Sequence, residues 1–287
     1  MKKRLIAIAT TLGIAQGGVF VPHRYAASLR PPSTYRNLEP IFAAAEPAMA
    51  EVLAAVDRYE DIVERFNGAK PPAPRWGQDW FPGLDGAAAY AIVRAGRPRR
   101  ILEIGSGHST RFMAQAVADG EMETEIHCVD PAPRADISAL PVRLRRRTLQ
   151  ETNLGTLPDL AAGDVLFVDS SHLALPGSDV DLLFSEIIPA LEPGVLVHVH
   201  DVLLPDGYPR AWDWRAYSEH QVVAAWLASG GLEPLFSSHF TRTRLAGRVA
   251  QSAAARIPVS PGAHETSLWC VKRSPRRVAA GAGSDVG

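Results

Sequence analysis

The chain has 287 residues, 46% of them hydrophobic, and a net charge of -1. This composition is typical of a globular protein that buries a sizeable core, and the balanced charge argues against nucleic acid as a partner. Its two cysteines, Cys128 and Cys270, lie in apolar runs without disulfide or metal-finger spacing, so we expect a cytoplasmic protein.

Residues 1–21 carry the one ambiguous targeting signal. A basic start, an apolar run and small residues are similar to an export signal. Against this, the run contains Thr10, Thr11 and Gln16, lacks a clear A-x-A cleavage site, and is marginal for a membrane span. We expect a helix that belongs to the folded chain or lies on a surface. Export or anchoring is the alternative, so association of residues 1–21 with the membrane periphery stays open.

The segment 40–67 is rich in alanine, and the helical spacing of its apolar residues predicts one or two helices. The proline-rich stretch "GAKPPAPRWGQ" follows it. We therefore expect a helical extension with a linker over 1–74, a main domain over 75–274, and a disordered tail over 275–287.

Beyond residue 83, apolar strand patterns alternate with helical ones. The expected helices cover 83–96, 109–119, 179–191 and 218–231, and the expected strands cover 99–105, 124–130, 142–149, 164–170, 194–201, 232–240 and 265–273. Continuous apolar strands separated by helices predict a doubly wound, Rossmann-like α/β sheet of seven strands with both faces covered. The irregular stretch 241–264 is a poor crossover helix, so we expect the last strand to be antiparallel.

The stretch "EIGSGHST" joins the first expected strand to a helix, which Ser109 or Thr110 could cap. Gly105 and Gly107 let the backbone pass close to a ligand, and the helix N-terminus offers free amides. A dinucleotide turn needs a third glycine where this chain has Thr110, and Glu103 would repel a pyrophosphate. These features favour a ligand with a positive group.

Asp130 ends the next strand, where an acid can accept both hydroxyls of a ribose. A ribose together with a cation and no pyrophosphate fits S-adenosylmethionine. His108, inside the turn, either touches the cofactor or faces solvent.

The series "EIGSGHS", "CVDP", "LFVDSSH" and "VHVHD" resembles the class I S-adenosylmethionine-dependent methyltransferases. The nearest branch is the bacterial small-molecule methyltransferases with a "VDSSH…GSDVD…HDV.LP.GYP" signature. The resemblance covers 75–273 and includes an antiparallel last strand. It implies that Glu103, Gly105 and Gly107 lie along the methionine, that Asp130 holds the ribose, and that Gln150 or Glu151 approaches the adenine. The cofactor-binding set is then Glu103, Gly105, Ser106, Gly107, Asp130, Gln150 and Asp169.

Four polar residues, Asp169, His172, His200 and Asp201, follow the fourth and fifth strands, whose carboxyl ends should meet beside the transferred methyl group. The catalytic candidates are Asp169 with His172 or His200 as general base. Alternatively, Asp169, His200 and Asp201 hold a divalent metal. Related sugar O-methyltransferases use magnesium bound by acids, whereas the histidine here favours zinc, manganese or iron. The structural alternative is that these acids cap loops, and His198 is expected in the core.

The acceptor is expected to bind the aromatic and polar segment that follows the fifth strand. The substrate candidates are Tyr208, Trp212, Trp214, Arg215, Tyr217 and Glu219. Such a pocket suits a sugar or a polyketide-like ring, although these aromatics could instead only pack the loop onto the core.

The sequence thus predicts a methyltransferase acting on a small-molecule hydroxyl, in a sugar or a secondary metabolite. The alternatives are an NAD(P)-linked oxidoreductase, an inactive cofactor-binding module, and metal-dependent oxygen chemistry. The acceptor and the oligomeric state are not predicted.

Overall fold

The computed structural model describes residues 2–14, 17–18 and 23–274. It divides into two compact units, Met1–Pro32 and Ser33–Gly287. The first unit contains helix α1 (Lys2–Thr11) and a 3₁₀ turn at Ala26–Ser28. The second unit contains every strand of the sheet. The predicted disordered tail, 275–287, lies outside the described residues.

Apolar side chains of helix α1 are exposed to solvent. Leu5, Ile6 and Ile8 are each about half exposed or more. Within the described residues, no helix is both long enough and apolar enough to cross a membrane. The cytoplasmic location and the membrane association of residues 1–21 stay predictions.

The second unit is built on a seven-stranded sheet in the order β3-β2-β1-β4-β5-β7-β6. The strands are β1 (Arg100–Ile104), β2 (Glu125–Val129), β3 (Val142–Arg145), β4 (Val165–Val168), β5 (Leu196–Val199), β6 (Leu232–Ser237) and β7 (Leu268–Lys272). β1 to β5 are parallel, whereas β7 is antiparallel to both β5 and β6. The predicted Rossmann-like sheet with an antiparallel last strand is confirmed.

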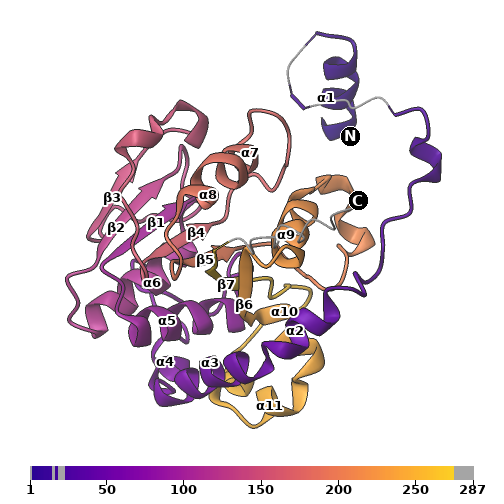
Figure 1. The fold of residues 1–287 in the computed structure, drawn as a ribbon. Coiled ribbons are helices and arrows are strands. Elements are labelled where there is room, and N and C mark those ends of the chain that lie inside the picture. Colours follow the sequence, from indigo (N-terminus) through magenta and orange to yellow (C-terminus); the bar gives the residue numbers. More distant parts are fainter. Residues whose placement is uncertain (1, 15–16, 19–22, 275–287) are drawn as a thin grey trace, which may run out of the picture. The chain divides into compact units, whose positions relative to one another are not determined.

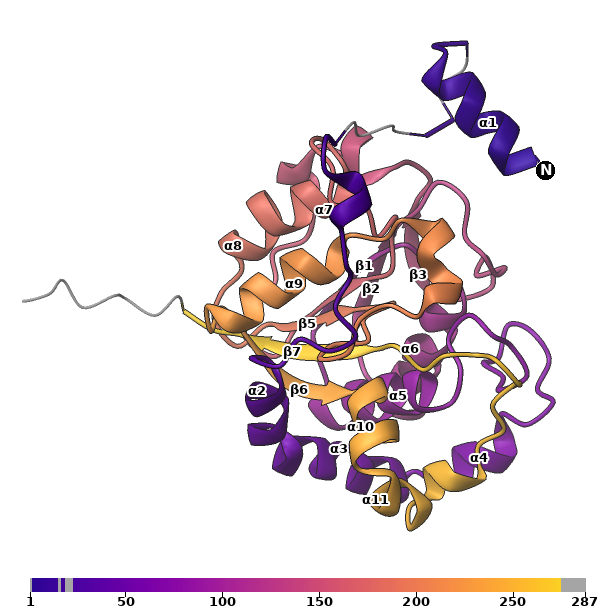
Figure 2. The same cartoon turned by 90° about the vertical axis from the view of Figure 1, so that its right-hand side faces the viewer.

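Helices cover both faces of this sheet. The N-terminal ones are α2 (Glu39–Ala44), α3 (Glu46–Arg58) and α4 (Asp61–Arg65), and the next are α5 (Leu84–Gly96), α6 (His108–Asp119), α7 (Asp179–Leu182), α8 (Ile188–Ala190) and α9 (Glu219–Ala228). In Figures 1 and 2, α3, α5 and α6 lie on one face of the sheet and α7, α8 and α9 on the other.

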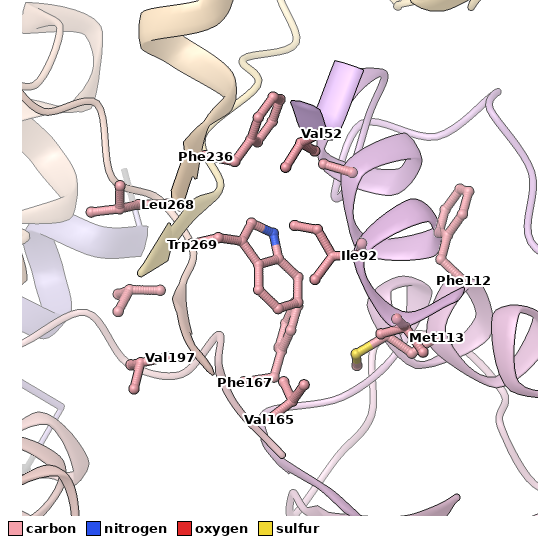
Figure 3. Packing of buried hydrophobic residues seen from close by; sticks show 14 of the residues in the cluster. Val52, Ile92, Phe112, Met113, Val165, Phe167, Val197, Phe236, Leu268 and Trp269 are labelled. Atoms are coloured by element: carbon pink, nitrogen blue, oxygen red, sulfur yellow. The ribbon is translucent and has the colours of Figure 1, made fainter. Parts of the chain in front are cut away.

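One part of the core lies between the sheet and the α5–α6 layer. All four residues of β4 are buried, as expected for a strand covered on both faces. Figure 3 shows the indole of Trp269, from β7, pointing toward Ile92 of α5 and Phe167 of β4. The rings of Trp269 and Phe167 meet edge to face at 5.8 Å, which is a favourable aromatic geometry.

The structure corrects several predicted boundaries. The large unit begins at Ser33, so helices α2 to α4 belong with the sheet rather than to an extension that ends at residue 74. Segment 40–67 forms three helices, because a proline occupies the first turn of α2 and of α3. The helix predicted at 179–191 is interrupted by a π-helical turn at Leu183–Ile187, just before the proline of α8.

The region after β6 is more helical than predicted. The strand expected to reach residue 240 stops at Ser237, whose hydroxyl accepts a bond from the amide of Phe240 and so caps α10 (Ser238–Arg244). Helix α11 (Ala246–Ala250) and a 3₁₀ turn at Ala253–Arg256 follow. These pieces return the chain to the sheet without a crossover helix, which is why β7 is antiparallel.

Candidate active site

The glycine turn after β1 touches the end of β4. Gly105 has φ +81°, and a Cβ placed on it would lie 1.7 Å from the carbonyl oxygen of Asp169. Gly107 has φ +153° and is the N-cap residue of α6. Neither Ser109 nor Thr110 is the cap residue that we predicted; instead the Thr110 hydroxyl accepts a hydrogen bond of 2.9 Å from the amide of Gly107. The turn therefore requires glycine for steric reasons.

Glu103 is fully buried beneath this turn. One carboxylate oxygen accepts a bond from the Ser109 hydroxyl (2.6 Å) and the other from the Thr110 hydroxyl (2.7 Å). Burial raises the pKa of Glu103 to about 7, although these two hydroxyls oppose the rise. The carboxylate is thus tied to the first turn of α6, and its predicted place beside the methionine stays a prediction.

Asp130, at the end of β2, also supports the turn. One carboxylate oxygen accepts bonds from the amide and the hydroxyl of Ser106 at 2.6 and 3.0 Å, and the other accepts from the amide of Ala132 at 2.7 Å. A carboxylate can accept about four hydrogen bonds, so a ribose hydroxyl could still be bound. Gln150 is exposed in the 3₁₀ turn after β3, and its predicted contact with adenine is untested.

His108 does not face solvent. It is 8% exposed, and its Nδ1 is buried with no hydrogen-bond partner in the part of the chain that the structure describes. Burial, together with the nearby Arg111 and Arg75, lowers the pKa of His108 to about 4. The imidazole is therefore neutral at physiological pH.

The four polar residues predicted after β4 and β5 do converge. His172 Nε2 lies 3.5 Å from Asp169 Oδ1 and 3.5 Å from Asp201 Oδ2, and His200 Nδ1 lies 3.4 Å from Asp169 Oδ1. His172 and Asp201 both have positive φ, at 60° and 54°. Such strained backbone is found where a side chain must be aimed at one place. His198, as predicted, is a core residue, stacked on Phe167 with its Nε2 2.9 Å from the Ser267 hydroxyl.

Electrostatics hold this cluster in a defined charge state. Burial disfavours a charged His172, but Asp169, Glu219 and Asp201 outweigh it and raise its pKa to about 10. Burial also disfavours a charged His200, but neighbouring carboxylates, mainly Asp169, hold its pKa well above its ordinary value. Burial alone would raise the pKa of Asp169, but His200 and His172 outweigh it and hold this pKa well below its usual range. Two imidazolium ions therefore flank an ionised Asp169.

Two further carboxylates sit behind the histidines. Glu219 is fully buried with Oε2 2.9 Å from His172 Nδ1, and Asp85 is fully buried with Oδ2 3.3 Å from His200 Nε2. Asp85 also accepts bonds from the amides of Thr266 and Ser267. Glu219 was predicted to face the acceptor; its complete burial means that it instead holds His172. Asp85, at the start of α5, was not predicted at all.

Each histidine is thus bonded to a buried carboxylate on one nitrogen and faces Asp169 with the other. Asp169 is the most accessible member of the cluster, with 30% of its side chain exposed, whereas the figure for Asp201 is 12% and for each histidine 6%. A molecule that reaches this cluster therefore meets Asp169 first.

The metal site predicted at Asp169, His200 and Asp201 stays a prediction. Within the described residues, no group of three or more histidine, cysteine, aspartate or glutamate side chains is arranged to hold a metal ion.

The segment 205–218, here termed the acceptor loop, brings most of the predicted aromatic residues beside the cluster. The ring of Tyr217 lies 4.6 Å from that of His172, and Tyr208 contacts the rings of both Tyr217 and Trp212. Arg215 lies over Trp212, with 4.1 Å between Cζ and the ring centre, and Nη1 donates to Asp201 Oδ2 at 3.2 Å. Trp214 is more peripheral, at 63% exposed. The acceptor loop thus packs directly against the polar cluster.

Comparison with known proteins gives a family match over part of the chain. Residues 102–202 match a family model described as a methyltransferase domain. These residues include the glycine turn, Asp130 and the β4–β5 cluster. No curated protein matches the sequence.

Several solved structures resemble this chain distantly. The O-methyltransferase from Bacillus cereus in complex with SAH is 14% identical, with a TM-score of 0.43, over 78% of this chain and 91% of that one. SAH-bound PaMTH1, a methyltransferase from Podospora anserina, is 15% identical, with a TM-score of 0.42, over 90% of this chain and 100% of that one. The structure named cmcI-D160 Mg-SAM is 15% identical, with a TM-score of 0.35 over 48% of this chain, which spans 58% of its length. These likenesses are too distant to indicate an acceptor.

Proposed function

We propose that this chain, which carries a methyltransferase domain over residues 102–202, transfers a methyl group from S-adenosylmethionine to a hydroxyl oxygen of a small molecule. The proposal rests on the charge and the position of Asp169. It is ionised, it is the most accessible member of a polar cluster, and its backbone touches the glycine turn. The family match favours methyl transfer over the hydride transfer of an NAD(P)-linked oxidoreductase.

The turn fits an adenosine cofactor that has a positive tail. Gly107 places backbone without a side chain at the N-terminus of α6, and Gly105 lets the turn pack against the carbonyl of Asp169. Asp130, and Glu103 to the extent that it is ionised with a pKa of about 7, make this end of β1 and β2 more favourable to a sulfonium and an ammonium than to a pyrophosphate. When bound, S-adenosylmethionine supplies an electrophilic methyl group.

Asp169 is the group that receives the acceptor's proton. Methyl transfer is an in-line displacement in which the new oxygen–carbon bond forms as the sulfur–carbon bond breaks, and the hydroxyl proton must leave. A carboxylate oriented from both sides accepts a hydrogen bond from the hydroxyl, aims the oxygen lone pair, and takes the proton as the hydroxyl becomes acidic. This activates the acceptor oxygen.

The histidines have a different role from the one predicted. Since His172 and His200 are already protonated, neither has a lone pair with which to act as general base. Their part is to fix the orientation and the negative charge of Asp169. The acceptor hydroxyl belongs to a sugar or a secondary metabolite with a ring that can lie against Tyr217 and Trp212.

The test combines binding with turnover. Purified protein is titrated with S-adenosylhomocysteine and, separately, with NADH by calorimetry, and is then incubated with methyl-labelled S-adenosylmethionine and a panel of hydroxylated small molecules. We expect binding of S-adenosylhomocysteine, no binding of NADH, and a labelled methyl ether. D169N should reduce methyl transfer by roughly 10²-fold or more with little change in S-adenosylhomocysteine affinity. D213N, which alters an exposed acid of the acceptor loop, is the matched control.

Three results would count against the proposal. Binding of NADH alone would favour the oxidoreductase alternative. Binding of S-adenosylhomocysteine without any methylated product, in the panel or in cell extract, would favour the inactive-module alternative. Full activity of D169N would remove Asp169 from the mechanism.

A further inference from the structure

We infer that the acceptor carries a carboxylate as well as its hydroxyl, and that Arg215 binds this carboxylate. The inference rests on the proposed function, because it assigns the substrate class of the same site. It starts from the position of Arg215, which no part of the proposed methyl transfer uses.

Among the described residues, the guanidinium of Arg215 is held through Nη1. Nη1 donates to Asp201 Oδ2 (3.2 Å) and to the Tyr217 hydroxyl (3.0 Å). Nε is buried and has no hydrogen-bond partner within the described residues. A buried donor without a partner costs about 1–3 kcal/mol, so its retention here is consistent with a ligand that completes it. The edge formed by Nε and Nη2 matches the two oxygens of a carboxylate.

The acceptor loop fixes this edge in space. Arg215 Cζ lies 4.1 Å from the ring centre of Trp212 and 5.3 Å from that of Tyr217, so aromatic contacts constrain the guanidinium. The base of the loop is fastened at Asp206, which is paired with Arg244 and with His239 Nε2 at 2.8 Å. At its other end, the amide of Ser218 donates to the carbonyl of His172 (3.0 Å). The free edge is therefore preorganised, which lowers the entropy lost on binding.

Arg215 is joined to Asp169 through a short chain of contacts. Asp201 lies between Arg215 and His172, and His172 lies 3.5 Å from Asp169. The rings of Tyr217 and Trp212 lie alongside this chain. A ring that rests on them could present a hydroxyl to Asp169 and an acidic group to Arg215.

The chemistry of the free edge selects the acidic group. A guanidinium offers donors and no acceptor, so its partner must be an acceptor, and a carboxylate fills both donor positions with one planar group. A phosphate has similar geometry but a larger negative charge, which Asp169 and Asp201 would repel more strongly. A hydroxylated ring acid thus fits this site better than a neutral sugar or a phosphorylated metabolite.

The experiment compares pairs of probes that differ only in the acid. Protein saturated with S-adenosylhomocysteine is titrated by calorimetry with 3,4-dihydroxybenzoate and 3,4-dihydroxybenzamide, and with glucuronate and glucose. We expect at least one acid to bind about tenfold more tightly than its neutral partner, because the charge-assisted pair is lost in the latter. R215Q should abolish this preference and R215K should retain only part of it. R210Q, at an exposed arginine of the same 3₁₀ helix, should leave it unchanged.

Equal affinities within both pairs, no binding by any of the four probes, or an acid preference that survives in R215Q would overturn the inference. The S-adenosylhomocysteine titration and the urea midpoint of each variant separate the other failures. A protein that does not bind S-adenosylhomocysteine contradicts the proposed function itself. If R215Q unfolds, R215K decides, because it keeps the charge and removes the planar fork.

Discussion

A Cβ on Gly105 would lie 1.7 Å from the carbonyl oxygen of Asp169. This close approach joins the two halves of the candidate site. Gly105 follows β1 and begins the glycine turn, and Asp169 follows β4 and begins the polar cluster. The amide of Asp169 also donates to the carbonyl of Ile104 at 2.8 Å. The position of the Asp169 side chain is therefore set by the same backbone that forms the glycine turn.

G105A should disrupt both folding and cofactor binding. Alanine at φ +81° is strained, and its Cβ would have to displace backbone rather than a flexible side chain. We expect a loss of at least ~3 kcal/mol in the free energy of unfolding, measured with urea, and no detectable S-adenosylhomocysteine binding by calorimetry. G163A is the matched control, because Gly163 has φ +88° but open space around it, and should cost only about 1 kcal/mol. Equal costs for the two variants would contradict the steric explanation.

Glu103 should make stability depend on pH. Burial raises its pKa to about 7 in the folded protein, against 4.5 in the unfolded chain. Between these values the folded state keeps a proton that the unfolded state has released. The contribution of Glu103 to the free energy of unfolding is fully present below about pH 4.5. It is lost as the pH rises through 7, and the total loss is about 3 kcal/mol.

Urea unfolding at pH 4.5 to 8 checks this dependence. In E103Q the free energy of unfolding should fall less steeply over this range than in the wild type. E192Q, at an exposed glutamate, should keep the wild-type slope. If E103Q and the wild type have the same slope, then Glu103 does not carry the raised pKa.

Sequence reasoning succeeds where local pattern and topology suffice. The glycine turn is visible in "EIGSGHST", and the convergence of Asp169 with His200 follows because neighbouring parallel strands end at one edge of the sheet. The strands themselves are continuous apolar runs, so their number and order along the chain could be predicted.

The remaining features depend on contacts between distant segments. Asp85 lies 115 residues from His200 in the sequence, and nothing in "GLDGAAAY" marks it as a partner for an imidazole. Glu219 follows an aromatic loop, and only its burial in the structure reveals that it faces His172 instead of a ligand. The charge state of both histidines depends on these two buried acids together with Asp169, so the sequence alone could not exclude a histidine base.

Replacing Glu219 should therefore change the acidity of Asp169 without touching the cofactor turn. In E219Q the Nδ1 of His172 keeps a hydrogen-bond acceptor but loses a buried negative charge, so the imidazolium is less favoured. A weaker imidazolium stabilises ionised Asp169 less, and the pKa of Asp169 rises. We expect the acid limb of the pH–rate profile to move to higher pH, with little change in the rate at neutral pH, where Asp169 stays ionised, and with S-adenosylhomocysteine affinity unchanged. E186Q, at an exposed glutamate, is the control. A reduced rate whose acid limb stays in place would mean that Glu219 supports the fold and does not set the charge of the cluster.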